Sequence, residues 1–498
     1  MRKYVKISTF ILLAALMITG CSKSQSEQTA SSGNMNSEQT RVDEADKENI
    51  SIILSDDEIT VNGSSASTDS SEAVYVGADI VYYEEGKDET YGEGSDKDAH
   101  SKAEAAEHTV LTITKPGTYE VSGSISKGQI SIDLGEESED DPDAVVNLIL
   151  NNAEITCTVA PSIVVYNAYE CGSDDEEDAT PSVDTSNAGF NLILAKNSDN
   201  VISGSYVAKI YKDGTTKEDV ENGDAKKKYK FDAAIDSLVS FNISSGENGK
   251  LTVNAENEGI SSGLHMTVKS GEIRINASDD SINTNEDNVS VFTLNGGTVI
   301  CNSGLGTEGD GIDSNGYIVI NDGFVIACAN GSSQDSGLDS DKGIYINGGT
   351  VLGTGNMYDE ISDQSTQKFM VFMLDETIKE NQLIMLTDEE ENPITAFYAF
   401  NDYSIAVYSS PELSEESGKA YKVASVEGDL KENVYFNITG FEDMEPLSSS
   451  SRDVIGKPGM GGPGPEPGDG EMKEHPEGER PELPEGERPK SPEFQKDL

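Results

Sequence analysis

Carboxylate and amide side chains recur beside a single apolar residue in a phrase that the sequence repeats. The phrase reads "GDGIDSNGYIVINDGFVIA" at residues 309–327 and "SGLDSDKGIYINGGTVLG" at residues 336–353. Ca²⁺ prefers oxygen ligands of this kind and takes roughly six to eight of them, so the sequence predicts calcium sites. The predicted calcium ligands are Asp279, Asp280, Asn283, Asp310, Asp313, Asp335, Asp339 and Asp341.

The same residues have a second interpretation, in which Asp and Asn cap the backbone amides of turns and hold no metal. Zinc and redox metals are not expected, because no His pair or Cys cluster accompanies the carboxylates. His265 stands alone and is interpreted as a core or surface residue. Four cysteines are interpreted as small buried residues, of which the first two could form a disulfide: Cys157, Cys171, Cys301 and Cys328.

Arg274 is the candidate base if the protein is an enzyme. In a polysaccharide lyase, calcium would acidify the proton alpha to a uronate carboxylate, and a basic side chain would remove it. Arg274 lies in "EIRIN", shortly before Asp279 and Asp280. The alternative role for a lone arginine on a strand is that of a salt-bridge partner.

Tyr317 and Tyr345 are the candidate sugar-binding residues. The chain contains no Trp, so tyrosine rings would have to supply the apolar faces on which sugars stack. We place both tyrosines in equivalent, outward-facing positions of the two phrases. The alternative is that they are ordinary strand aromatics.

A repeat of 26 residues must position these groups. It is seen at Gly271, Gly297, Gly323 and Gly349, and short β-branched runs separated by Asn, Gly, Asp and Ser surround it. A period this short, without helices, predicts a parallel β-helix whose coils stack about 4.8 Å apart.

The β-helix has three further consequences. The acidic phrases align in a series through Asp236, Ser261, Asn283, Asp313 and Asp339, and the glycine of each phrase is expected at a corner with positive φ. One buried stack should contain Ile260, Ile282, Ile312 and Leu338. The "NLIL" runs at Asn147 and Asn191 are 44 residues apart, and we interpret this interval as two coils of 22 residues each.

The ends of the chain differ from its middle. "MRKYVKISTFILLAALMITGC" predicts a lipoprotein signal peptide at 1–20 with lipid attached to Cys21. We expect a flexible tether at 21–49, a β-helix at 50–360, a β-rich C-terminal extension at 361–443 and a Pro/Gly/Glu-rich disordered tail at 444–498. Charged inserts at 84–107, 136–143, 173–178 and 209–230 are interpreted as surface loops.

The chain resembles bacterial lipoproteins called carbohydrate-binding domain-containing proteins. The resemblance rests on "ITKPGTYEVSGSISKGQISIDL" (113–134), "VVNLILNNAEIT" (145–156), "KFDAAIDS" (230–237) and the repeats, and it covers about residues 50–356. It implies an all-β, right-handed parallel β-helix like that of pectate lyases, with calcium sites and binding of plant cell-wall polysaccharide, including acidic sugars. Where the family repeat "DDGIHAD" has His, this chain has Asn283, Asp313 and Asp339, so a His-dependent contact is not expected.

The net charge of −57, from 92 acidic and 35 basic residues, excludes nucleic acid as a partner. We therefore expect a monomeric lipoprotein, anchored on the extracellular face of the membrane, that binds an acidic polysaccharide through calcium and performs no catalysis. A calcium-dependent lyase acting on uronate polymers is the first alternative. A structural or adhesive surface protein is the second.

Overall fold

The computed structural model describes residues 49–449, and strands dominate them. The chain is all-β, with 4% helix and 48% strand, and its sheets are mostly parallel, as predicted. The predicted signal peptide, the lipidation site Cys21, the tether up to residue 48 and the tail from residue 450 onward lie outside the described residues.

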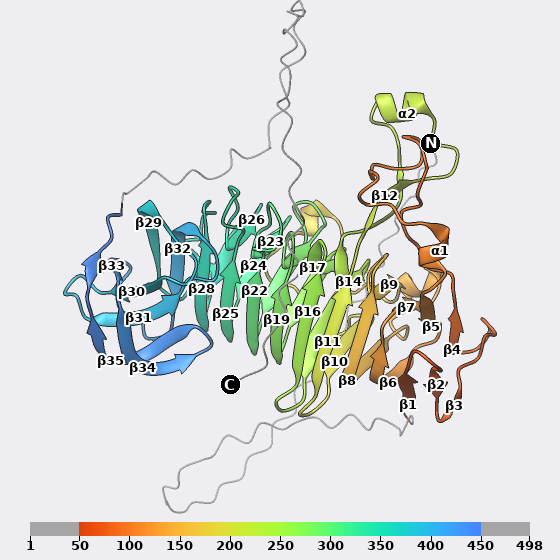
Figure 1. Cartoon of the computed structure of the whole chain (residues 1–498), viewed down its shortest axis with the longest axis horizontal. Helices are drawn as coiled ribbons and strands as arrows, with labels where there is room; N and C mark the ends of the chain where they lie inside the picture. The colour runs from red at the N-terminus through yellow and green to blue at the C-terminus, as the bar shows by residue number, and fades with distance from the viewer. Residues whose placement is uncertain (1–48, 450–498) are drawn as a thin grey trace, which may run out of the picture. The chain divides into compact units, whose positions relative to one another are not determined.

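Three ladders of parallel strands make up most of this region (Figure 1). Ladder 1 contains β5 (Thr109–Ile113), β7 (Gly128–Asp133), β9 (Ile163–Asn167), β14 (Ala233–Ser237), β17 (Glu258–Ser262), β20 (Ile282–Thr284), β23 (Ile312–Ser314) and β26 (Leu338–Ser340). An antiparallel strand, β4 (Val74–Gly77), pairs with β5 at one end.

Ladders 2 and 3 share the long strands β6 (Gly117–Ile125) and β8 (Val146–Cys157), whose first halves belong to ladder 2 and second halves to ladder 3. Ladder 2 begins at β1 (Ile50–Leu54) and continues through β10 (Phe190–Leu194), β15 (Phe241–Ser245), β18 (His265–Val268), β21 (Val291–Leu294), β24 (Tyr317–Ile320) and β27 (Gly343–Ile346). Ladder 3 continues through β11 (Asp199–Gly204), β16 (Lys250–Ala255), β19 (Glu272–Asn276), β22 (Thr298–Asn302), β25 (Phe324–Cys328) and β28 (Thr350–Gly355). The chain visits ladders 1, 2 and 3 in turn and then returns to ladder 1, and we call each such round a circuit.

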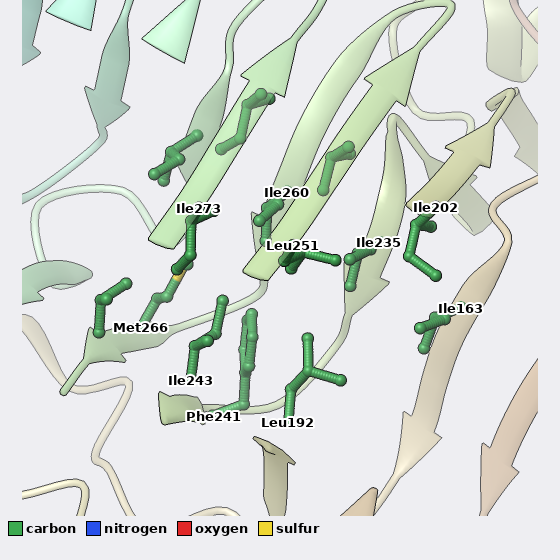
Figure 2. Packing of buried hydrophobic residues seen from close by; sticks show 14 of the residues in the cluster. Ile163, Leu192, Ile202, Ile235, Phe241, Ile243, Leu251, Ile260, Met266 and Ile273 are labelled. Atoms are coloured by element: carbon green, nitrogen blue, oxygen red, sulfur yellow. The ribbon is translucent and has the colours of Figure 1, made fainter. Parts of the chain in front are cut away.

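The main core lies between the three ladders, where apolar side chains from successive circuits pack against one another (Figure 2). The predicted stack is confirmed, because Ile260 pairs with Ile282, Ile282 with Ile312 and Ile312 with Leu338. The three isoleucines are fully buried and Leu338 is 3% exposed. Each buried aliphatic side chain contributes roughly 1.5–3 kcal/mol relative to an exposed one.

Two groups of glycines have different roles from those expected. Gly297 and its equivalents in the 26-residue repeat have positive φ, 90° at Gly297, where a Cβ is unfavourable. The glycines directly before the buried apolar residue of the acidic phrases, Gly259, Gly311 and Gly337, do not have positive φ, so that expectation is wrong. They permit close approach instead, since a Cβ on Gly311 would lie 2.5 Å from the carbonyl oxygen of Gly337.

The two "NLIL" runs lie in adjacent circuits, because Asn147 pairs directly with Asn191. The predicted pair of 22-residue coils is therefore wrong. One circuit accounts for all 44 residues, since β9 occupies ladder 1 between the runs and the acidic insert before β10 lengthens the connection.

The charged inserts contain the helices of the described region. These are α1 (Lys102–Ala105), α2 (Lys217–Glu221) and the 3₁₀ turns Glu136–Asp140 and Glu176–Asp178. The lysine-rich insert also forms an antiparallel hairpin of β12 (Val207–Tyr211) and β13 (Lys227–Phe231). Within residues 49–449, no helix is long and apolar enough to cross a membrane.

The segment after β28 is antiparallel. Strand β32 (Tyr403–Ser409) pairs with both β28 and β29 (Phe369–Ile378). A six-stranded sheet follows, of β30 (Leu383–Thr387), β31 (Pro393–Tyr398), β33 (Lys419–Lys422), β34 (Ser425–Lys431), β35 (Val434–Glu442) and β36 (Glu445–Pro446). Its apolar side chains form a second core with Ile300, Ile326 and Leu352, which face outward from ladder 3.

Candidate functional site

The predicted acidic series lies in one row along ladder 1. Asp236 pairs with Ser261, Ser261 with Asn283, Asn283 with Asp313 and Asp313 with Asp339. These residues alternate with the buried isoleucines, so their side chains point to the outer face of the ladder. The structure thus brings together the polar residues that the repeat predicts.

A second set of carboxylates lies two residues before the buried isoleucines of three successive strands of ladder 1, at Glu258, Asp280 and Asp310. Asp280 Oδ1 accepts a hydrogen bond from the Asp310 backbone N–H at 2.6 Å, and Asp310 Oδ1 accepts one from the Ser336 N–H at 2.5 Å. Asp335 likewise accepts one from the Gly309 N–H at 2.6 Å. The amide-capping role that we gave as an alternative is therefore present for one oxygen of each aspartate.

Other oxygens of this cluster are buried and unpartnered. Glu258 is 6% exposed and Asn283 is 8% exposed. Within residues 49–449, Glu258 Oε2 and Asn283 Oδ1 have no hydrogen-bond partner, whereas Asn283 Nδ2 donates to Glu258 Oε1 at 3.2 Å. Buried oxygens without donors are costly, and a hard cation would satisfy both.

The electrostatics of the cluster favour a positive charge. Burial, followed by the carboxylates of Asp339 and Asp280, raises the pKa of Asp310 to about 10. Burial and the nearby carboxylates of Asp232, Asp280 and Asp236 raise the pKa of Glu258 well above its usual range. Like charges held this close disfavour ionisation of one another.

A lysine supplies a positive charge at one end of the acidic row. Lys230, on β13, forms a 2.5 Å ion pair with Asp232, and it lowers the pKa values of Asp236 and Glu258 against the larger raising effects. In the described region, no ion pair to lysine or arginine engages Asp280 or Asp310, farther along the row.

The donor chemistry fits calcium, because the cluster offers carboxylate and amide oxygens without sulfur or imidazole. The side chains of residues 49–449 do not, however, bring three or more His, Cys, Asp or Glu groups into a formed metal site. Asp279 lies beside the row, and burial raises its pKa, whereas Asp341 lies exposed after β26.

Arg274 lies away from this cluster. It is on β19 in ladder 3, and its guanidinium pairs with Glu432 Oε2 at 2.6 Å. The salt-bridge role that we gave as its alternative is therefore the one observed.

Tyr345 lines a hollow of about 370 Å³ on the outer face of ladder 2. Thr293, Val319 and Tyr345 are in register and form its floor. Asn295, Asn321 and Asn347 border it, and each successive asparagine amide donates to the preceding side-chain oxygen at 2.9 Å. The wall is formed by 181–183, and we call this hollow the asparagine groove.

The structure corrects the predicted equivalence of the two tyrosines. Tyr317 pairs with Gly343, and Tyr345 pairs with Val319, so the tyrosines are offset by two residues. Their rings still touch, with centroids 6.2 Å apart, but only Tyr345 lines the groove.

The cysteines and His265 take no part in these sites. All four described cysteines are free, so the Cys157–Cys171 disulfide is absent, and Cys171 is partly exposed whereas Cys157, Cys301 and Cys328 are buried. His265 is a core residue, 3% exposed, and burial lowers its pKa to about 4.

Sequence reasoning missed Glu258 and the asparagine border. Glu258 occupies the same place before Ile260 that Asp280 occupies before Ile282, so alignment of the phrases could have found it. The asparagines precede the repeated glycines, and we used only the glycines.

Proteins built from stacked repeats commonly use the extended surfaces of their repeats for binding. The family model for carbohydrate-binding domain-containing proteins matches residues 107–385, which is more than half of the chain. The chain belongs to the carbohydrate-binding domain-containing protein family, and this part of the predicted resemblance is confirmed.

Comparison with curated proteins finds no match. One solved structure, described as the polysaccharide lyase-like protein from C. thermocellum in a gadolinium derivative, is similar. The identity is 20% and the TM-score is 0.36, over 61% of this chain and 90% of that chain. Similarity of this degree does not indicate a shared activity.

Proposed function

We propose that this protein is a lipoprotein on the extracellular face of the membrane that binds polysaccharide and performs no catalysis. The observation that carries the proposal is the match of the carbohydrate-binding family over residues 107–385. The asparagine groove supports it, because an aromatic face bordered by amides offers both stacking and hydrogen bonds to a sugar.

The fold that we infer is a right-handed parallel β-helix, with each circuit as one coil. Parallel strands of one sheet joined by a crossover are right-handed in the great majority of cases, and every circuit returns to ladder 1 by such a crossover. This arrangement places equivalent residues of successive coils about 4.8 Å apart, a spacing suited to a linear polymer.

We infer that calcium binds beside ladder 1 and bridges to acidic sugars. Glu258 and Asn283 would supply their unpartnered oxygens to the ion. Asp280 and Asp310, and Asp313 and Asp339 in the row, would supply further ligands. A divalent cation there offsets the repulsion between a chain of net charge −57 and a uronate polymer. Lipid at Cys21 would hold the protein at the membrane, and we expect it to be a monomer.

The decisive test is binding to insoluble pectin, xylan and cellulose with calcium and with chelator. Tyr345→Ala should weaken binding at least about fivefold, because a stacked ring contributes on the order of 1 kcal/mol. Tyr398→Ala is the matched control, since Tyr398 is 38% exposed on the C-terminal sheet. Equal binding by both variants would contradict the role of Tyr345.

The lyase alternative is tested on the same samples. Ultraviolet absorbance of an unsaturated product, with calcium and polygalacturonate, would support it if Arg274→Ala abolished the signal. We expect no product, because Arg274 is paired with Glu432. Failure to bind any glycan would favour the structural or adhesive alternative.

A further inference from the structure

A second hollow lies on the outer face of ladder 1, over the strands that precede β14 and the start of the acidic row. Its volume is about 210 Å³. Three tyrosines line it from three different elements, Tyr75 on β4, Tyr166 on β9 and Tyr229 on β13. We call it the tyrosine groove.

The floor of this groove follows the direction in which the strands stack. Tyr75 pairs with Thr112, and Thr112 pairs with Ser131, so the three residues form one row across β4, β5 and β7. With Tyr166 on β9, the groove crosses four strands, or about 14 Å. It can therefore hold a short stretch of a linear polymer, with one sugar beside each strand.

The floor supplies hydroxyl groups that are free for a ligand. Thr112 and Ser131 are 8% and 6% exposed, yet both line the hollow. Within residues 49–449, no hydrogen bond engages either side-chain hydroxyl. Because both residues line the hollow, their hydroxyls are available to donate hydrogen bonds to a ligand and to accept them from it.

Packing holds one of the rings in place. Tyr166 meets Phe231 edge-on, with centroids 5.4 Å apart, and meets Tyr229 at 6.3 Å. Since Phe231 and Tyr229 are both on β13, the hairpin orients the aromatic side of the groove. Rigid rings lose little entropy when a sugar stacks on them.

The charges in the groove distinguish between ligands. Asp79 and Asp133 both line it, and Asp133 accepts hydrogen bonds from Asn167 Nδ2 at 2.8 Å and from the Gly135 N–H at 3.0 Å. The nearby hairpin lysines Lys228 and Lys230 are paired with Asp213 and Asp232. Carboxylates accept hydrogen bonds from sugar hydroxyls but repel uronates.

We propose that the tyrosine groove is a second glycan-binding site, which takes a neutral, linear polysaccharide without calcium. The inference rests on the proposed carbohydrate-binding function but assigns a different stretch of the outer face of ladder 1 and a different ligand class. The acidic face with calcium and the tyrosine groove would let one chain hold two kinds of polymer.

The test is calorimetric titration of the full chain with cellohexaose, xylohexaose, mannohexaose and hexagalacturonate in the presence of chelator. We expect one or more neutral hexasaccharides to bind and hexagalacturonate not to bind. Tyr75→Leu and Tyr229→Leu should each weaken that binding about tenfold or more, while Tyr398→Leu leaves it unchanged. Melting curves establish that the variants are folded, and Tyr75→Leu leaves the hairpin intact if Tyr229→Leu disturbs it.

Removing one carboxylate from the groove gives a second test, which measures the binding of hexagalacturonate. Asp79→Asn should leave neutral binding in place and allow detectable binding of hexagalacturonate, because one repelling carboxylate is removed. Calcium should not be needed for either effect.

Three results separate the two proposals. Loss of neutral binding in Tyr345→Leu, with Tyr75→Leu and Tyr229→Leu as wild type, would overturn the tyrosine groove and leave the proposed function standing. Binding to insoluble polysaccharide without binding to any neutral hexasaccharide would also overturn it. No binding to any glycan would overturn both.

Discussion

At the scale of one residue, Asp236 shows how burial in the acidic row changes the pKa of a carboxyl group. Its side chain is 4% exposed and accepts hydrogen bonds from the N–H groups of Asp232 and Ala233 at 3.0 and 3.3 Å. Burial and the neighbouring carboxylate of Asp232 nevertheless raise the pKa of Asp236 to about 8. The folded chain therefore holds a proton on Asp236 at pH values where the unfolded chain, with a pKa of about 3.9, does not.

This difference predicts a pH dependence of stability with a defined sign. A raised folded-state pKa gives stability that is complete below about pH 4 and is lost as the pH rises toward about 8. The effect is on the order of 5 kcal/mol at most. Asp236→Asn keeps the acceptor oxygen and cannot ionise, so urea denaturation in chelator should show a flatter profile between pH 4 and 8.

Asp57→Asn is the control, because Asp57 is exposed. It should reproduce the wild-type profile. An Asp236→Asn profile as steep as that of the wild type would mean that Asp236 ionises normally in the folded chain.

At the scale of the element, the turn between ladders 2 and 3 has one glycine with positive φ in each circuit of the 26-residue repeat. Gly297 has φ of 90°, and a Cβ there would lie 2.6 Å from the Gly271 carbonyl oxygen. Gly214, in the hairpin insert, has nearly the same φ of 89° but open space around it. The two positions therefore share the backbone strain and differ only in the clash.

Alanine at each position should separate these two costs. Gly214→Ala should lower the free energy of unfolding by about 1 kcal/mol, the cost of the left-handed conformation. Gly297→Ala should lower it by several kcal/mol, because displacing the neighbouring backbone adds roughly 1–3 kcal/mol. Urea denaturation measures both, and equal losses would show that the circuits can move apart.

The repeat predicted the parts of the fold that each circuit must reproduce. Ile260, Ile282, Ile312 and Leu338 aligned as expected because stacking requires one apolar residue per circuit. The 44-residue spacing of Asn147 and Asn191 led to the wrong prediction of two coils, because the sequence does not distinguish a long insert from an extra circuit. The offset of Tyr317 and Tyr345 was missed because strand register is set by backbone pairing.

The position of the C-terminal sheet was not predicted, although a signal existed. Ile300, Ile326 and Leu352 face outward from strands that are apolar on both faces. A strand that is apolar on both faces is normally covered on both sides. From the sequence, we assigned these strands to the central core alone. The burial of Glu258 was likewise beyond the sequence, since the repeat does not show what packs over the outer face of ladder 1.

At the scale of the whole molecule, charge links stability to calcium. A chain of net charge −57 that concentrates carboxylates along ladder 1 should be more stable with the divalent cation than without it. At a calcium concentration 100 times the Kd, stabilisation should reach about 2.7 kcal/mol per site. Thermal melts in chelator and in a calcium series would show this as a rising midpoint.

A matched variant ties the effect to the cluster. Glu258→Gln removes one buried carboxylate and should reduce the calcium-dependent rise, while Glu58→Gln, on the exposed surface, should not. Magnesium should stabilise less, because it demands near-octahedral geometry and gives up water reluctantly. A midpoint that does not respond to calcium would remove the metal from the proposed function.

The pairing of β28 with β32 has a consequence for association between molecules. A parallel ladder that simply stopped at β28 would present a row of unpaired N–H and C=O groups, onto which another chain could add its own strands. The antiparallel strand β32 occupies that edge from Val351 to Gly355. The C-terminal segment therefore blocks strand addition at this edge, and a chain truncated after Asn356 should self-associate through β28 where the full chain stays dispersed.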